Sequence, residues 1–103
     1  MANLYDSDDL NKLPKLGAGA PAAWKGFLDF DKVALADGVI PKKYKELMAL
    51  AVALTTQCPY CLAVHKEAAR KAGATAEEMA ETAFVAAALR AGAAVTHATH
   101  LVD

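Results

Sequence analysis

The sequence is poor in large aromatic side chains, which make up 7% of its 103 residues, and it contains only two cysteines. Aromatic side chains therefore cannot supply most of the buried area. Hydrophobic residues nevertheless reach 55%, and many of them are alanine, which favours helices whose backbones approach closely. A chain of this length forms one domain with a modest core, so we expect it to cover part of its apolar surface by self-association.

An excess of charge of one sign is also missing, because the formal net charge is −1 and the two signs are interspersed. Without a basic stripe to neutralise a phosphate backbone, we expect no nucleic-acid partner. The first residues lack the cationic start and apolar segment of a secretion signal. Charged residues interrupt the apolar runs before they reach the length of a membrane span. These absences favour a cytoplasmic protein without a membrane partner.

Helical periodicity and capping residues predict an all-α chain with a single domain over residues 1–103. Residues 1–20 are expected to form an N-terminal arm and a flexible connector, in which Asp6 or Ser7 caps a short helix. Further helices are predicted over residues 21–36, 41–55, 58–73 and from residue 75 to near the C-terminus. With about four to six helices in all, the subunit is expected to assemble into a symmetric oligomer.

Four features of these helices lead to specific expectations. Residues 47–54 are apolar all round, which predicts burial on every side of the second long helix. The lysines of residues 42–45 are interpreted as its solvated first turn. Trp24 and Phe27 are expected in the core or at subunit contacts rather than in a substrate site. Residues 75–78 (TAEE) form a capping-box pattern at the start of the last helix.

The candidate reactive residues are the two cysteines of residues 58–61, with the sequence CPYC, and His65, which follows them. Cys58 occupies the N-cap position of a predicted helix and Pro59 its first position, so N–H groups and the helix dipole favour a thiolate there. Cys61 lies one turn further on, within reach of a disulfide, and His65 projects from the same face. One thiol can attack a substrate, the other can resolve the product as a disulfide, and the imidazole can move protons.

Two other interpretations of the cysteines stay open. CxxC also occurs in zinc sites, although a second CxxC or a Cys/His pair at finger spacing is missing, and His97 and His100 add ligands only if the last helix folds back over the motif. Otherwise these two histidines complement the dipole at the helix end. The cysteines can also be two buried thiols without chemistry. We expect no metal and no cofactor.

Residues 45–53 (KELMALAVA), residues 58–61 and His65 together resemble the carboxymuconolactone decarboxylase superfamily, and more closely its AhpD-like alkylhydroperoxidase branch. The resemblance covers roughly residues 22–98. It implies an all-helical subunit that assembles into a homotrimer or a homohexamer. It also implies a hydroperoxide substrate that the CxxC pair reduces, and an external dithiol protein that reduces the pair afterwards.

The resemblance implies a role for each of four residues. Cys61 corresponds to the cysteine that becomes a sulfenic acid, and Cys58 to the proton donor and resolving thiol. His65 and Glu46 correspond to the members of a proton relay. Without the resemblance, Glu46 is an ordinary first-turn glutamate favoured by the helix dipole. Helix-end electrostatics alone make Cys58 the more acidic thiol, so the order of the two cysteines stays open.

The chain departs from the best-known AhpD proteins at Tyr60, where they carry a histidine. Tyrosine donates a hydrogen bond but does not shuttle protons near neutral pH, so the relay must be shorter, use water or work less well. Two alternatives to a thiol peroxidase stay open. One is a lactone decarboxylase or related lyase that uses Glu46 and His65 as acid and base, and the other is a non-enzymatic redox-sensing oligomer.

Overall fold

The computed structural model describes residues 5–103 and contains helices and connecting turns, with no strand among these residues. The all-α prediction is therefore confirmed. Residues 1–4, part of the predicted N-terminal arm, lie outside the described residues. In the described part of the chain, no helix combines the length and apolar character that a membrane span requires. The elements are the 3₁₀ helix η1 (Ser7–Lys12), α1 (Leu13–Ala18), α2 (Pro21–Leu35), α3 (Lys42–Thr56), α4 (Pro59–Lys71), α5 (Ala76–His97) and the 3₁₀ helix η2 (Ala98–Leu101).

The prediction of a flexible connector is wrong, because α1 occupies most of that segment. Pro14 lies in the first turn of α1, where its missing N–H breaks no helical hydrogen bond. Gly17 is buried against Trp24 of α2, and a Cβ at this position would overlap the indole ring. Only glycine allows the two helices to approach this closely. The predicted cap at Asp6 is confirmed, since its carboxylate accepts the Asp8 N–H at 2.9 Å.

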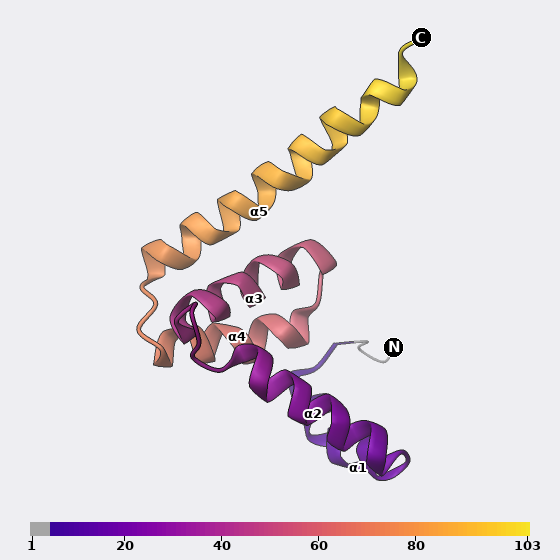
Figure 1. Cartoon of the computed structure of the whole chain (residues 1–103), viewed down its shortest axis with the longest axis vertical. Helices are drawn as coiled ribbons and strands as arrows, with labels where there is room; N and C mark the ends of the chain where they lie inside the picture. Colours follow the sequence, from indigo (N-terminus) through magenta and orange to yellow (C-terminus); the bar gives the residue numbers. More distant parts are fainter. Residues whose placement is uncertain (1–4) are drawn as a thin grey trace.

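The centre of the fold is α3, which lies between α4 and α5 (Figure 1). Glu46, Leu50 and Ala53 are buried along one stripe of α3, at spacings of four and three residues. Leu50 packs in the core with Ala69 of α4 and Ala74, which precedes α5. Small side chains at this contact let the backbones approach closely. The packing therefore holds α4 against the face of α3 that carries Glu46.

The prediction that residues 47–54 are buried on every side is wrong for the single chain. Met48 and Val52 are 49% and 59% exposed, because α4 and α5 cover only part of the circumference of α3. The outer helices are also open to solvent, since α2 has no buried residue and α5 has only Ala86. Figure 1 shows the C-terminal half of α5 extending beyond the other helices.

The lysines of residues 42–45 are not a solvated first turn, which corrects that interpretation. Lys45 Nζ donates to the carbonyl of Ala36 at 2.6 Å, directly after the end of α2. Lys43 Nζ pairs with a carboxylate oxygen of Glu78 on α5 at 2.8 Å. These two lysines therefore join α3 to the helices on either side of it.

The start of α5 carries the predicted capping box, which is confirmed. Thr75 Oγ1 accepts the Glu78 N–H at 3.1 Å, and Glu78 Oε1 accepts the Thr75 N–H at 2.9 Å. The hydrogen bond from Lys43, and after it the backbone N–H of Thr75, holds the pKa of Glu78 below its ordinary value. The same ion pair raises the pKa of Lys43.

Candidate functional site

The two cysteines lie at the start of α4 and form a disulfide, with their Cα atoms 5.3 Å apart. Cys58 is the N-cap of the helix, and its Sγ accepts the backbone N–H of Cys61 at 3.2 Å. Pro59 follows in the first turn, as predicted. A sulfur at this place faces N–H groups and the positive end of the helix dipole. This setting stabilises a thiolate on Cys58 once the disulfide is reduced.

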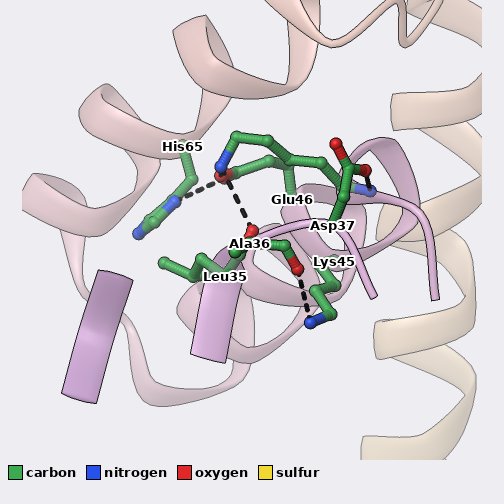
Figure 2. Close-up of polar contacts among 7 residues, drawn as sticks. Leu35, Ala36, Asp37, Lys45, Glu46 and His65 are labelled. Atoms are coloured by element: carbon green, nitrogen blue, oxygen red, sulfur yellow. Dashed lines mark hydrogen bonds and ion pairs between the residues drawn. The ribbon is translucent and has the colours of Figure 1, made fainter. Parts of the chain in front are cut away.

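His65 lies one turn beyond Cys61 and meets Glu46 across the contact between α4 and α3. Its Nδ1 is 2.6 Å from Glu46 Oε2. Glu46 is only 2% exposed, and the side chain of His65 is 20% exposed. Figure 2 shows the two side chains pointing toward each other. When Nδ1 donates to the carboxylate, Nε2 keeps a lone pair that can accept a proton.

Lys42 is a third member of this polar group, and sequence reasoning missed it. Its Nζ lies 3.1 Å from Glu46 Oε1 and 3.2 Å from the carbonyl oxygen of Leu35, the last residue of α2. Both oxygens of the buried carboxylate therefore have a partner. The available signal was the four-residue spacing of Lys42 and Glu46, which places two side chains on one helix face.

A pocket of about 390 Å³ opens beside Cys61 and His65. Cys61 lines this pocket, whereas Cys58 does not. Trp24 and Phe27, which were expected in the core or at subunit contacts, form an aromatic wall of the pocket, with ring centroids 6.0 Å apart. They lie in the pocket wall because α2, which has no buried residue, packs against α1 and the start of α3 and leaves these rings open to the pocket. The remaining lining residues are Asp9, Leu10, Leu13, Asp31, Tyr60 and Val64.

Tyr60 connects the cysteine motif to the N-terminal segment. Its hydroxyl donates to Asp9 Oδ2 at 3.3 Å, and its ring meets the ring of Tyr5 edge to face, with centroids 4.8 Å apart. Lys12 binds the same carboxylate of Asp9 at 2.7 Å. The hydrogen bond from Lys12, with a smaller contribution from Tyr60, holds the pKa of Asp9 below its ordinary value. Tyr60 thus holds η1 at the edge of the pocket.

The zinc interpretation gains no support, because residues 5–103 contain no group of three His, Cys, Asp or Glu side chains that could hold a metal ion. His97 ends α5 and His100 lies in η2, with their ring centroids 4.8 Å apart. Figure 1 shows this end of the chain pointing away from α3 and α4. The two histidines therefore contact each other and do not join the cysteine motif.

The fold and these contacts define an all-helical protein with a CxxC pair at a helix start and a paired histidine and glutamate behind it. The chain belongs to the carboxymuconolactone decarboxylase family, whose sequence profile matches residues 21–103. The resemblance stated from the sequence is therefore confirmed for the family, and the AhpD-like branch is consistent with it.

Two uncharacterised proteins are similar in sequence to this chain. Uncharacterised protein 4 of the cox locus of Paracoccus denitrificans is 51% identical over 72 residues, which is 70% of this chain and 65% of the relative. A protein of Cupriavidus necator is 39% identical over 66 residues, which is 64% of this chain and 58% of the relative. The matched part is thus less than two thirds of the length of either relative.

Two crystal structures share the fold. One is the apo form of a carboxymuconolactone decarboxylase family protein from Legionella pneumophila, with a TM-score of 0.76 and 35% sequence identity over 89% of this chain and 82% of that chain. The other is a protein from Methanobacterium thermoautotrophicum, with a TM-score of 0.78 and 31% identity over 84% of this chain and 97% of that chain. Both likenesses agree with the family assignment.

Proposed function

We propose that this protein is a thiol-dependent peroxidase of the AhpD-like type, which reduces organic hydroperoxides in the cytoplasm through Cys58 and Cys61. The observation that carries the proposal is the place of Cys61, in the wall of a pocket that His65 also lines, with Cys58 at disulfide distance. The aromatic and aliphatic lining of the pocket suits the organic part of such a substrate. No cofactor is needed for this chemistry.

The first step oxidises Cys61. Its thiol gives its proton to Nε2 of His65, and the thiolate attacks the terminal oxygen of the hydroperoxide. A bond forms between sulfur and oxygen while the bond between the two oxygens breaks. The departing alkoxide takes the proton back from His65 and leaves as an alcohol, so that Cys61 becomes a sulfenic acid.

The second step closes the disulfide. The Cys58 thiolate attacks the Cys61 sulfur, a bond forms between the two sulfurs, and the hydroxyl of the sulfenic acid leaves as water after taking up a proton. An external dithiol protein then supplies two electrons and two protons to restore both thiols. The two cysteines divide the work in a way that the geometry supports, because Cys61 faces the pocket while the Cys58 sulfur accepts a backbone N–H at the helix start.

The test is peroxide-dependent loss of thiol in the reduced protein, compared with Cys58→Ser and Cys61→Ser. We expect one equivalent of cumene hydroperoxide to remove both thiols of the wild type. Cys58→Ser should accumulate a sulfenic acid on Cys61 that dimedone traps and mass spectrometry locates. Cys61→Ser should react no faster than a free thiol. An unchanged thiol titre in the wild type contradicts the proposal.

A lyase that uses Glu46 and His65 is the second candidate, because this pair makes its contact without involving either sulfur. A double variant, Cys58→Ser with Cys61→Ser, separates the two functions. It abolishes a peroxidase and leaves lactone decarboxylation intact. Stoichiometric oxidation of the wild type without turnover under any dithiol reductant indicates the redox-sensing module instead.

We also propose that the working form is a symmetric homo-oligomer, a trimer or a hexamer. The single chain exposes 7911 Å², whereas a compact monomer of this mass exposes about 5,500 Å². Its radius of gyration is 16.8 Å, against about 13 Å for a compact domain of this length. The excess surface is largely apolar, because Phe30 and Val33 of α2 and Phe84, Leu89 and Val95 of α5 are all exposed. This apolar surface is what a second copy would cover.

The assembly is tested by light scattering on size-exclusion fractions. Leu89→Arg places a charge on the exposed face of α5, and we expect the molar mass to fall toward the 10.8 kDa of one chain. The control is Asn11→Arg, which adds the same charge to an exposed polar position of η1 and should leave the assembly unchanged. A wild type that elutes with the mass of one chain contradicts this proposal.

A further inference from the structure

Lys42 stands out because a charged side chain from the start of α3 ends on the buried carboxylate that binds His65. Its Nζ lies 3.1 Å from Glu46 Oε1, and the side chain of Lys42 is 44% exposed while that of Glu46 is 2% exposed. A carboxylate buried to this degree is stable as an anion only when cations or hydrogen-bond donors face it. Lys42 is the lysine that meets this requirement, since Lys43 and Lys45 bind elsewhere.

The ammonium of Lys42 is held in place from two sides. It donates to the carbonyl of Leu35 at 3.2 Å, at the C-terminal end of α2, where a cation also complements the helix dipole. Its own backbone N–H donates to the carboxylate of Asp37 at 2.6 Å, which fixes the first turn of α3. Lys42 therefore connects the end of α2, whose earlier turns form the pocket wall, to Glu46.

Several charged groups face His65. The carboxylate of Glu46 meets its Nδ1, and the ammonium of Lys42 lies on the other oxygen of that carboxylate. Asp31 of α2 and Asp9 of η1 also line the pocket beside His65. A neutral imidazole with its proton on Nδ1 is the form that accepts a proton from a thiol. Lys42 thus holds the carboxylate in the place from which it orients the histidine.

We propose that Lys42 is a positioning residue of the dithiol site: its contact with Glu46 holds this buried carboxylate against Nδ1 of His65, so that Nε2 is the ring nitrogen that accepts the thiol proton. The expected effect of Lys42 on the rate of peroxide-driven disulfide formation rests on the proposed function. The orientation of His65 that the proposal describes is independent of whether a peroxide is the substrate.

The experiment compares Lys42→Met with the wild type and with Lys45→Met. Lys45 is a matched control, because it lies on the same turn and also binds a carbonyl after α2 but does not contact Glu46. The first readout is the pH titration of the His65 ring nitrogens in the reduced protein, followed by ¹⁵N NMR. We expect the midpoint to rise by about one pH unit in Lys42→Met, because the carboxylate of Glu46 then attracts the imidazolium without the opposing positive charge of Lys42. Lys45→Met should titrate as the wild type does.

The second readout is the pH profile of peroxide-driven disulfide formation. Its acid limb should move upward with the NMR midpoint in Lys42→Met, which lowers the rate about tenfold at a pH on that limb. Lys42→Arg keeps the positive charge and should restore the wild-type profile. If Lys42→Met does not fold, Lys42→Gln, which keeps a donor without the charge, is titrated with the same expectation.

The outcomes separate the two proposals. An unchanged His65 titration in Lys42→Met, or an equal shift in Lys42→Arg or Lys45→Met, overturns the role of Lys42. A wild type that does not react with peroxide overturns the proposed function, while the NMR titration still decides the question about Lys42.

Discussion

The unit formed by α3 and α4 and the two outer helices α2 and α5 differ in how they are held. The inner unit buries Leu50, Ala53 and Ala69 together with the carboxylate of Glu46. The outer helices bury one residue between them, Ala86 of α5, and expose long apolar faces. The polar pair of Glu46 and His65, which lies one helical turn beyond Cys61, is therefore formed within one chain. The outer faces, in contrast, remain available for contacts with other copies.

The two outer helices differ in their attachment: α2 touches α3 mainly near its C-terminal end, whereas α5 packs along α3, with Met79 against the core and Ala86 buried, and adds polar contacts. At the end of α2, the carbonyls of Leu35 and Ala36 accept hydrogen bonds from lysine side chains of α3. Lys43 of α3 pairs with Glu78 of α5. Arg90 of α5 also donates to the carbonyl of Thr55 on α3. Such exposed contacts contribute little free energy each. This difference between the inner unit and the outer helices predicts that substitutions inside the inner unit lower the free energy of unfolding far more than substitutions outside it.

The largest effect is expected from Leu50→Ala, which removes the side chain at the centre of the inner core. The lost apolar contacts and the remaining cavity should lower the free energy of unfolding by about 2–5 kcal/mol. Urea denaturation of the reduced protein at fixed concentration measures this change. Leu16→Ala on α1, whose side chain is 70% exposed, is the control and should change it by less than about 0.5 kcal/mol. Equal losses in the two variants would contradict the division into inner and outer parts.

A smaller loss is expected from Gly17→Ala, where α1 and α2 approach each other. The added methyl group overlaps the ring of Trp24, so the two helices must separate, at a cost of about 1–3 kcal/mol. Because Trp24 also lines the pocket, its fluorescence maximum should shift. Gly26→Ala, on an open part of α2, is the matched control and should stabilise the helix by about 0.5–1 kcal/mol. A stabilised Gly17→Ala protein contradicts the close packing.

The pair between Lys43 and Glu78 should contribute a small, pH-dependent part of the stability. The pKa of Glu78 is lowered from its ordinary 4.5, so the contribution is full above that pH and is lost as the pH falls through the folded value. The pKa of Lys43 is raised from its ordinary 10.5, so the contribution is full below that pH and is lost as the pH rises through the folded value. Thermal unfolding of Lys43→Met and wild type measures it. The two melting temperatures should differ slightly at pH 7 and converge in acid, and a difference that grows in acid would be inconsistent with the pair.

The smallest effect, a gain, is expected at the junction between the two helices of the inner unit. Gln57 ends α3 in the left-handed conformation, with φ of 56°, directly before Cys58. Glycine adopts this conformation without the steric cost of a Cβ, although it loses more freedom on folding. Gln57→Gly should therefore raise the free energy of unfolding by about 0.5–1 kcal/mol, measured by urea denaturation. A loss of stability would mean that the side chain of Gln57 makes a contact worth more than the strain.

Features that depend on neighbours along the chain could be predicted before the structure was known. The helices, the capping box of Thr75 and Glu78, and the cysteine N-cap followed by proline all follow from capping and periodicity. The spacing from Cys61 to His65 places both on one helix face for the same reason. The prediction of a flexible connector was wrong because Gly17 was interpreted as a source of flexibility. In the structure this glycine lies in α1 and makes room for the ring of Trp24.

Contacts between different helices could not be predicted in this way, because they depend on how the helices pack. Glu46 reaches His65 because α3 and α4 pack through small residues, and no local spacing specifies that contact. The aromatic wall of the pocket and the contact of Tyr60 with Asp9 likewise depend on how α2 and η1 are placed relative to α4. The physical reason is that hydrogen bonding and side-chain spacing within a helix are set by a few neighbouring residues, whereas the packing of helices is set by their whole surfaces.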